Sequence, residues 1–159
     1  MRTVRSEPRN RKHYRRLLVF AKDILRLCKK NSLEPIAYGS LAVFFYTQSM
    51  KLSVHDIDFL VQESDLSKLL SIMRANNIRY KYLTKYHVLQ VFRGASRLEF
   101  DSTQFWHSQP PKNTMLFISH GVILRTADVG YLRKIYRTQA RTGHHSQAAK
   151  KYELLRASA

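Results

Sequence analysis

Two aspartates in the run Val54–Val61 are the residues of this sequence best suited to chemistry. Asp56 and Asp58 lie one residue apart in an apolar, β-rich segment, so strand alternation puts both carboxylates on one face. At roughly 3.4 Å of rise per residue they are about 7 Å apart, and two such anions repel unless a cation lies between them. This pair therefore predicts a hard divalent cation bound by oxygen ligands. The alternatives are a solvated loop edge, or an Asp56 that caps a turn.

A third carboxylate is expected from the segment Arg97–Asp101. Alternation along a strand places Leu98 and Phe100 on one face and Glu99 and Asp101 on the other. If this strand lies beside the aspartate strand, it supplies a third metal ligand. Glu99 is the preferred ligand because apolar residues flank it, whereas Asp101 is equally suited to a strand end or a turn.

Gly39 and Ser40 follow a short apolar segment and precede a predicted helix. Glycine lets a backbone approach a ligand closely, and a helix N-terminus offers free N–H groups and a positive dipole end to phosphate. The Ser40 hydroxyl adds a donor. The pair thus predicts a phosphate-binding turn, although Gly-Ser pairs also occur simply where a chain turns.

The elements that must position these residues follow from hydrophobic periodicity and cap signals. Helices are predicted over 10–31, 40–48, 65–77 (capped by Ser64), from about 127 onward (capped by Thr126), and over 146–156. Strands are predicted over 36–38, 55–62, 79–84, 86–92, 97–102, 115–119 and 122–124. This order predicts a small α/β (α+β) domain with a mixed, curved sheet and helices packed mainly on one face.

Length and charge predict one domain with a polyanionic partner. Of the 159 residues, 28 are Lys or Arg and 11 are Asp or Glu, which gives a net charge of +17 and a pI near 10.4. Residues 1–12 are strongly basic and predict a flexible arm, with residues 13–159 forming the single domain. The charge favours RNA or DNA as partner, although a basic protein without such a role has the same composition. Tyr80, Tyr82, Tyr86 and Trp106 can stack on bases, but aromatic residues in amphipathic strands more often pack in the core.

The sequence favours the cytoplasm. A single cysteine, Cys28, excludes an intrachain disulfide and suits a reducing interior. No stretch approaches the roughly 18 apolar residues of a membrane span. The basic N-terminus lacks the apolar region of a secretory signal.

Three motifs together resemble the nucleotidyltransferase superfamily, which includes DNA polymerase β, poly(A) polymerases, lincosamide nucleotidyltransferases and the small AbiEii-like and MNT proteins. The motifs are the apolar-Gly-Ser turn Ala37–Ser40, the apolar-Asp-apolar-Asp run Val54–Phe59, and the later Leu98–Phe100. Tyr131–Ile135 is similar to a lysine-bearing C-terminal helix of small standalone members. The resemblance covers about residues 34–156, and the connection from Ser40 to Asp56 is a little longer than is usual in the family.

The resemblance implies an enzyme that moves a nucleoside monophosphate from a nucleoside triphosphate, such as ATP, to an acceptor hydroxyl and releases pyrophosphate. Two Mg²⁺ or Mn²⁺ ions would assist the transfer. The implied catalytic and metal-binding residues are Asp56, Asp58 and Glu99. The implied nucleotide-binding residues are Gly39, Ser40 and Lys134.

The acceptor and two alternative classes stay open. The positive charge favours RNA, such as a tRNA 3′ end, over a protein hydroxyl or a small antibiotic-like alcohol. One alternative is a catalytically silent RNA-binding module of the same fold. The other is an antitoxin-like interaction protein with a protein partner, which the sequence Gly-Ser-Leu-Ala-Val-Phe disfavours because MNT antitoxins have Gly-Ser-Arg-Ala-Arg-Gly at this position.

Overall fold

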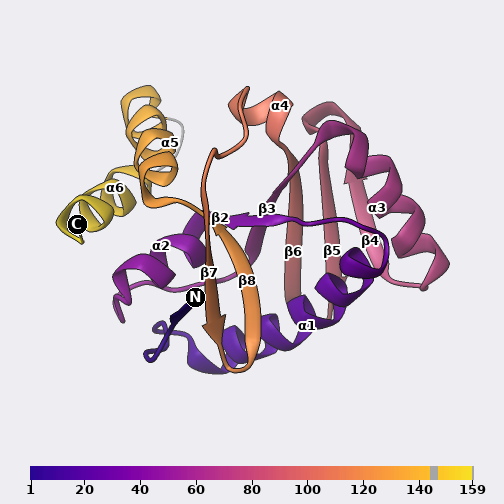
Figure 1. Ribbon diagram of the computed structural model, residues 1–159, viewed down its shortest axis with the longest axis horizontal. Helices are drawn as coiled ribbons and strands as arrows, with labels where there is room; N and C mark the ends of the chain where they lie inside the picture. The colour runs from indigo at the N-terminus through magenta and orange to yellow at the C-terminus, as the bar shows by residue number, and fades with distance from the viewer. Residues whose placement is uncertain (144–146, 159) are drawn as a thin grey trace.

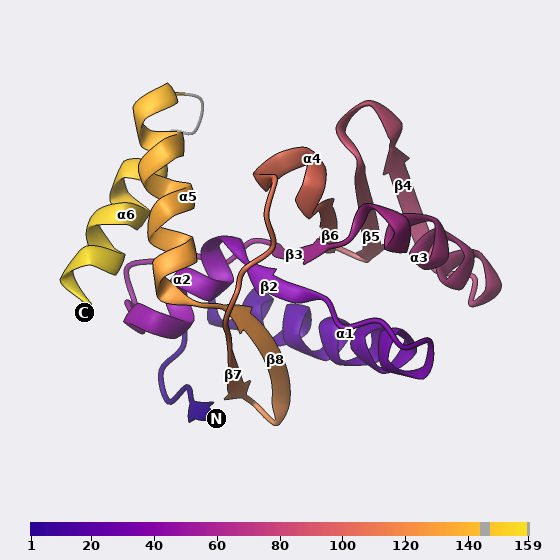
Figure 2. The same ribbon diagram turned by 45° about the horizontal axis from the view of Figure 1, so that its top comes forward.

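A mixed β-sheet forms the centre of the molecule (Figures 1 and 2). The computed structural model describes residues 1–143 and 147–158, and within them the sheet has eight strands in the order β1-β7-β8-β2-β3-β6-β5-β4. Three neighbouring pairs are parallel, β1 with β7, β2 with β8, and β3 with β6, and the others are antiparallel. The predicted mixed α/β class is confirmed.

The elements lie close to their predicted positions. The strands are β1 (Arg2–Thr3), β2 (Ile36–Tyr38), β3 (Ile57–Val61), β4 (Arg79–Leu83), β5 (Val88–Arg93), β6 (Ser96–Ser102), β7 (Thr114–Ser119) and β8 (Val122–Ala127). The helices are α1 (Arg11–Lys30), α2 (Gly39–Thr47), α3 (Glu63–Ala75), α4 (Thr103–His107), α5 (Val129–Thr142) and α6 (Ala148–Ala157), with a 3₁₀ turn η1 (Thr84–Tyr86). Residue 146, where the last helix was predicted to begin, lies outside the described residues.

One face of the sheet carries the hydrophobic core. Side chains of α1, α2 and α3 form a single buried cluster with those of the central strands. Phe59 of β3 stacks on Phe100 of β6 with ring centroids 5.2 Å apart, and Tyr14 of α1 packs edge-on against Phe44 of α2 at 5.6 Å. Because Asp58 alternates with Phe59 along β3, the aspartate points to the opposite face. The carboxylates therefore lie on the face of the sheet that does not carry this core.

The first residues are not the free arm that the sequence predicted. Arg2 and Thr3 pair in parallel with Phe117 and Ile118 of β7, and the Val4 amide donates to the Ile118 carbonyl at 2.9 Å. Val4 is buried. The physical reason is that the edge strand β7 offers unpaired backbone groups, while the apolar Val4 gains from leaving water.

Three features of the helices differ from the predictions: one cap, one starting residue and one helix that was not predicted. Asp128, not Thr126, caps α5, since its carboxylate accepts from the Tyr131 amide at 3.0 Å. Helix α3 begins at Glu63, before the predicted cap Ser64. Helix α4 was not predicted because its five residues are too few for a periodic pattern.

No helix of the part of the chain that the structure describes is long and apolar enough to cross a membrane.

The docked N-terminus makes a stability prediction. Val4→Asp places a charge at a buried position and loses the burial of a valine, so we expect the free energy of unfolding to fall by about 1.5–3 kcal/mol. The matched control is Thr3→Asp, which introduces the same side chain at the exposed neighbour and should change stability by less than about 0.5 kcal/mol. Urea denaturation measures both. Equal stabilities for the two variants would show that the N-terminus does not pack against the sheet.

Candidate functional site

Three carboxylates meet on the face of the sheet opposite the core. The parallel register of β3 and β6 places Asp58 directly beside Glu99, and Leu60 beside Asp101. One carboxylate oxygen from each of Asp58, Glu99 and Asp101 lies within 4.8 Å of the other two. The strand predicted to supply a third carboxylate is thus adjacent to the aspartate strand. It contributes both candidates, Glu99 and Asp101.

Asp56, the first of the predicted pair, lies apart from this cluster. It precedes β3 in a bend, and its Oδ2 atom accepts a hydrogen bond from the Arg97 guanidinium. Arg97 Nε also lies 3.5 Å from Glu99 Oε1, and Gln90 Nε2 donates to the same oxygen at 2.8 Å. Arg97 therefore lies between Asp56 and the cluster as a positive charge. The sequence could have indicated this role, because Arg97 lies two residues before Glu99 and therefore on the same face of the strand.

Gly39 begins α2 directly against the cluster. Its φ of +70° lies in the left-handed region, and a Cβ atom at this position would be 2.2 Å from Asp58 Oδ2. Any larger residue would therefore displace the Asp58 carboxylate. Ser40 follows as the second residue of the helix. The predicted strand-to-helix turn is present, and its N-terminal end faces the carboxylates.

Burial and mutual repulsion hold protons on this cluster. The pKa of Asp58 is raised well above its usual range, first by burial and then by the charges of Asp56, Asp101 and Glu99. Burial raises the pKa of Asp101 to about 7, although the Tyr38 hydroxyl, which donates to its Oδ2, opposes the shift. Such a site gains most from a ligand that brings positive charge.

The two lysines near the site have different surroundings. Lys134, the predicted nucleotide-binding residue, is exposed on α5 and lines a cavity of about 450 Å³ together with Trp106 and His107. Lys151 of α6 is partly buried. Burial lowers its pKa, and the charges of Asp58 and Asp56 oppose that shift only in part. Its ammonium group therefore lies within the field of the carboxylates. The sequence did not identify Lys151, because Lys150 is an adjacent lysine and the pattern alone does not say which of the two points toward the carboxylates.

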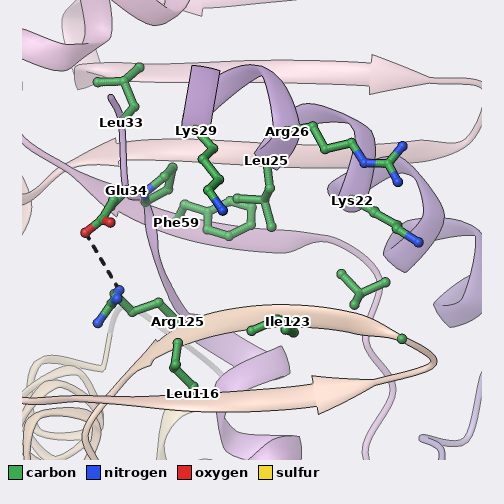
Figure 3. Close-up of a pocket in the computed structure, with 13 residues that line it drawn as sticks. Lys22, Leu25, Arg26, Lys29, Leu33, Glu34, Phe59, Leu116, Ile123 and Arg125 are labelled. Carbon is green, nitrogen blue, oxygen red and sulfur yellow. Dashed lines mark ion pairs between the residues drawn. The ribbon is translucent and has the colours of Figure 1, made fainter. Parts of the chain in front are cut away.

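The other face of the sheet has a hollow of its own, which Figure 3 shows. Lys22, Arg26 and Lys29 of α1 face Arg125 of β8 across a cavity of about 400 Å³. Phe59 forms part of its wall. Because Phe59 and Asp58 point to opposite faces of β3, the sheet separates this hollow from the carboxylates, and it takes no part in their chemistry.

The comparisons with known proteins identify the fold. No protein-family model and no curated protein sequence matches the chain. Several solved structures do match the chain. The antibiotic-resistance factor ANT(2'')-Ia matches with a TM-score of 0.68 at 15% identity, over 89% of this chain and 83% of that one. An antigenic nucleotidyltransferase-like protein from Paracoccidioides brasiliensis matches with a TM-score of 0.63 at 10% identity, over 89% and 75%.

A third similar structure is the lincosamide antibiotic adenylyltransferase LnuA. It matches with a TM-score of 0.57 at 9% identity, over 89% of this chain and 96% of that one. Across all three the identity is low and the coverage high, so the shared property is the fold. The chain has the nucleotidyltransferase fold, which confirms the resemblance found in the sequence.

The raised carboxyl pKa values make a prediction about pH. Between about pH 4 and 7 the folded chain keeps the Asp101 proton that the unfolded chain has lost, so this group makes the metal-free protein less stable as pH rises. Asp101→Asn should remove that part of the pH dependence. We expect the stability difference, variant minus wild type, to grow from pH 5 to pH 8 in urea denaturation with EDTA.

The comparison of variant with wild type is needed because the partly buried His107 changes stability with pH in the opposite direction. Burial lowers its pKa to about 4, so its contribution to stability rises with pH between about 4 and 6.5. This contribution is common to both proteins and cancels in the difference. A difference that stays constant from pH 5 to pH 8 would contradict the raised pKa of Asp101.

Proposed function

We propose that this chain is a Mg²⁺-dependent nucleotidyltransferase that transfers a nucleoside monophosphate from a nucleoside triphosphate to an acceptor hydroxyl. Pyrophosphate is the second product. The observation that carries this proposal is the cluster of Asp58, Glu99 and Asp101, whose carboxylate oxygens lie within 4.8 Å of one another on a nucleotidyltransferase fold.

The donor set fits a hard divalent cation, Mg²⁺ or Mn²⁺. All its donors are carboxylate oxygens, which these ions prefer. Burial and the neighbouring acids raise the pKa values of Asp58 and Asp101, and a bound cation would offset both effects. Asp58, Glu99 and Asp101 would hold the ion, and Asp56 could join them through Oδ1, since its contact with Arg97 uses Oδ2. A bound divalent ion neutralises phosphate charge and lowers the pKa of an acceptor hydroxyl.

The chain's own residues bind and orient the triphosphate. The backbone at Gly39 and Ser40 presents the N-terminal amides of α2 to the phosphates. Lys151 adds positive charge beside Asp58, and Lys134 adds it from α5. Arg97 holds Asp56 in place through its guanidinium. Catalysis then consists mainly of positioning and charge neutralisation.

The favoured acceptor is RNA, such as a tRNA 3′ end. The net charge of +17 supports a polyanionic partner, and the exposed side of α1 concentrates this charge. Its exposed cations are Arg11, Lys12, Arg15, Arg16, Lys22, Arg26, Lys29 and Lys30. A protein hydroxyl and a small alcohol are the other acceptors. The similarity to LnuA, a lincosamide antibiotic adenylyltransferase, supports the small alcohol. The buried Cys28 thiol suits the reducing cytoplasm.

The carboxylates make the first prediction about activity. With each α-labelled nucleoside triphosphate, Mg²⁺ or Mn²⁺, and total RNA as acceptor, we expect labelled RNA. Asp58→Asn and Glu99→Gln should lower the transfer rate by at least about a hundredfold, the size of effect seen when charge stabilisation is lost. Asp23→Asn is the matched control. Asp23 lies on α1, away from the carboxylate face, where it pairs with Arg93 of β5, so this change should leave the rate unchanged.

Two outcomes would contradict the proposal. The first is transfer that survives in both Asp58→Asn and Glu99→Gln, which would remove the cluster from the reaction. The second is the absence of transfer to RNA, to protein and to small alcohols by the wild type. RNA binding retained without transfer would instead indicate the silent RNA-binding module.

The basic side of α1 makes a separate prediction about RNA. Changing Arg11, Lys12 and Arg16 to Gln removes three exposed charges near the start of α1, so the log–log dependence of RNA affinity on salt should flatten by about 2, at roughly 0.7 per contact. Arg15 is left intact because it is paired with Glu7. The control changes three exposed lysines elsewhere, Lys68, Lys81 and Lys85, to Gln. Equal slopes for both triple variants would show that RNA does not bind along α1.

A further inference from the structure

A cavity lies between α4 and α5, beside the carboxylate cluster. Its volume is about 450 Å³, and Figures 1 and 2 show α4 at the end of β6 with α5 to its left. Helix α4 contributes Trp106 and His107, and α5 contributes Tyr131, Lys134 and Ile135. The cavity is large enough for a nucleoside-sized ligand, since small-molecule pockets usually begin at about 300 Å³.

Tyr38 connects this cavity to the carboxylates. Its hydroxyl donates to Asp101 Oδ2, and its ring packs edge-on against His107 with centroids 5.4 Å apart. His107 in turn packs edge-on against Tyr131 at 6.3 Å. The inner wall of the cavity thus begins one side chain away from the carboxylate cluster. A ligand whose reacting phosphate lies at the carboxylates can extend directly into the cavity.

The aromatic walls are held in place before any ligand arrives. The indole Nε1 of Trp106 donates to the Tyr86 carbonyl at 2.9 Å. The Tyr131 hydroxyl donates to the Gln109 carbonyl at 2.8 Å. Both rings are held through their polar ends, and Trp106 remains 45% exposed. Such preorganisation lowers the entropic cost of binding.

The chemistry of the walls selects a planar, uncharged group joined to an anion. Trp106, Tyr131 and Ile135 provide aromatic and apolar surface, and the partly buried His107 is neutral because burial lowers its pKa to about 4. Gln109, Thr138 and Gln139 add hydrogen-bonding groups, and Lys134 adds one positive charge. A nucleobase stacks on aromatic rings and hydrogen-bonds to amides, while the phosphates attached to its ribose suit a lysine.

We infer that the cavity between α4 and α5 holds the nucleobase of the nucleoside triphosphate, with Trp106 and Tyr131 as its stacking residues. This inference rests on the proposed function for the position of the phosphates. It assigns the choice among the four nucleotides to Gln109, Thr138 and Gln139, whose side chains lie where they can reach the edge of a base.

The experiment uses the single tryptophan of the chain, since Trp106 is its only one. Intrinsic fluorescence is followed while adenosine, guanosine, cytidine or uridine is added to the full chain in EDTA. Because these probes carry no phosphate, binding requires neither metal nor carboxylates. We expect at least one nucleoside to change the emission to a saturating value.

Variants at Tyr131 separate stacking from fluorescence artefacts. Tyr131→Leu removes the ring, and its nucleoside Kd should rise roughly five- to a hundredfold, the range for losing one stacked base contact. Tyr131→Phe keeps the ring and should bind within about threefold of the wild type. Tyr82→Leu, which changes a partly buried tyrosine on β4, is the matched control and should bind as the wild type does. Melting temperatures confirm that each variant is folded.

The outcomes distinguish this inference from the proposed function. Labelled transfer with no response of Trp106 to any nucleoside or triphosphate, and an unchanged KM of Tyr131→Leu for the triphosphate, would overturn the inference alone. A saturable Trp106 response that Tyr131→Leu weakens would support it, even if no acceptor were ever labelled. An Asp58→Asn protein that binds nucleosides normally but transfers nothing would support both.

Discussion

The repulsion among Asp58, Glu99 and Asp101 is the constraint on which the rest of the structure depends. Their carboxylate oxygens lie within 4.8 Å of one another. Two like charges about 4 Å apart cost about 4 kcal/mol near a protein surface with an effective dielectric constant of about 20. In the metal-free chain, protons on Asp58 and Asp101 reduce this cost. A divalent cation removes it, and the same ion is what phosphoryl transfer requires.

The surrounding elements bring these carboxylates close together and supply hydrogen-bond donors to the acids. The parallel pairing of β3 with β6 sets Asp58 beside Glu99, and Gly39 allows α2 to begin in contact with the Asp58 carboxylate. Arg97, Gln90 and Tyr38 each donate to one of the acids around the site. Their hydrogen bonds fix the carboxylates in position and leave the space between them for a cation.

Much of this arrangement was predictable from the sequence because it depends on local patterns. Alternation in Val54–Val61 and in Arg97–Asp101 identified both strands and the face that carries their acids. The sequence favoured Glu99 over Asp101 as the third ligand, but two residues on one face of a strand are not separated by pattern alone until the neighbouring strand is placed. The structure brings both into the cluster.

Other features depend on contacts between distant segments, which periodicity does not encode. Val4 packs against β7 more than a hundred residues away, so the N-terminus looked like a free basic arm. Lys151 differs from Lys150 only because α6 turns it toward Asp58. Trp106 lies on the short helix α4, where no helical repeat could show that it faces α5.

The most direct test of the account is to locate the metal. Crystals grown with Mn²⁺ and a nonhydrolysable triphosphate analogue give an anomalous difference map in which the anomalous scattering of manganese locates the ion. The account predicts a peak bound by carboxylate oxygens of Asp58 and of Glu99 or Asp101, and its loss in Asp58→Asn crystals grown in the same way. A map without a peak at these carboxylates, or with manganese bound elsewhere in the chain, would contradict it.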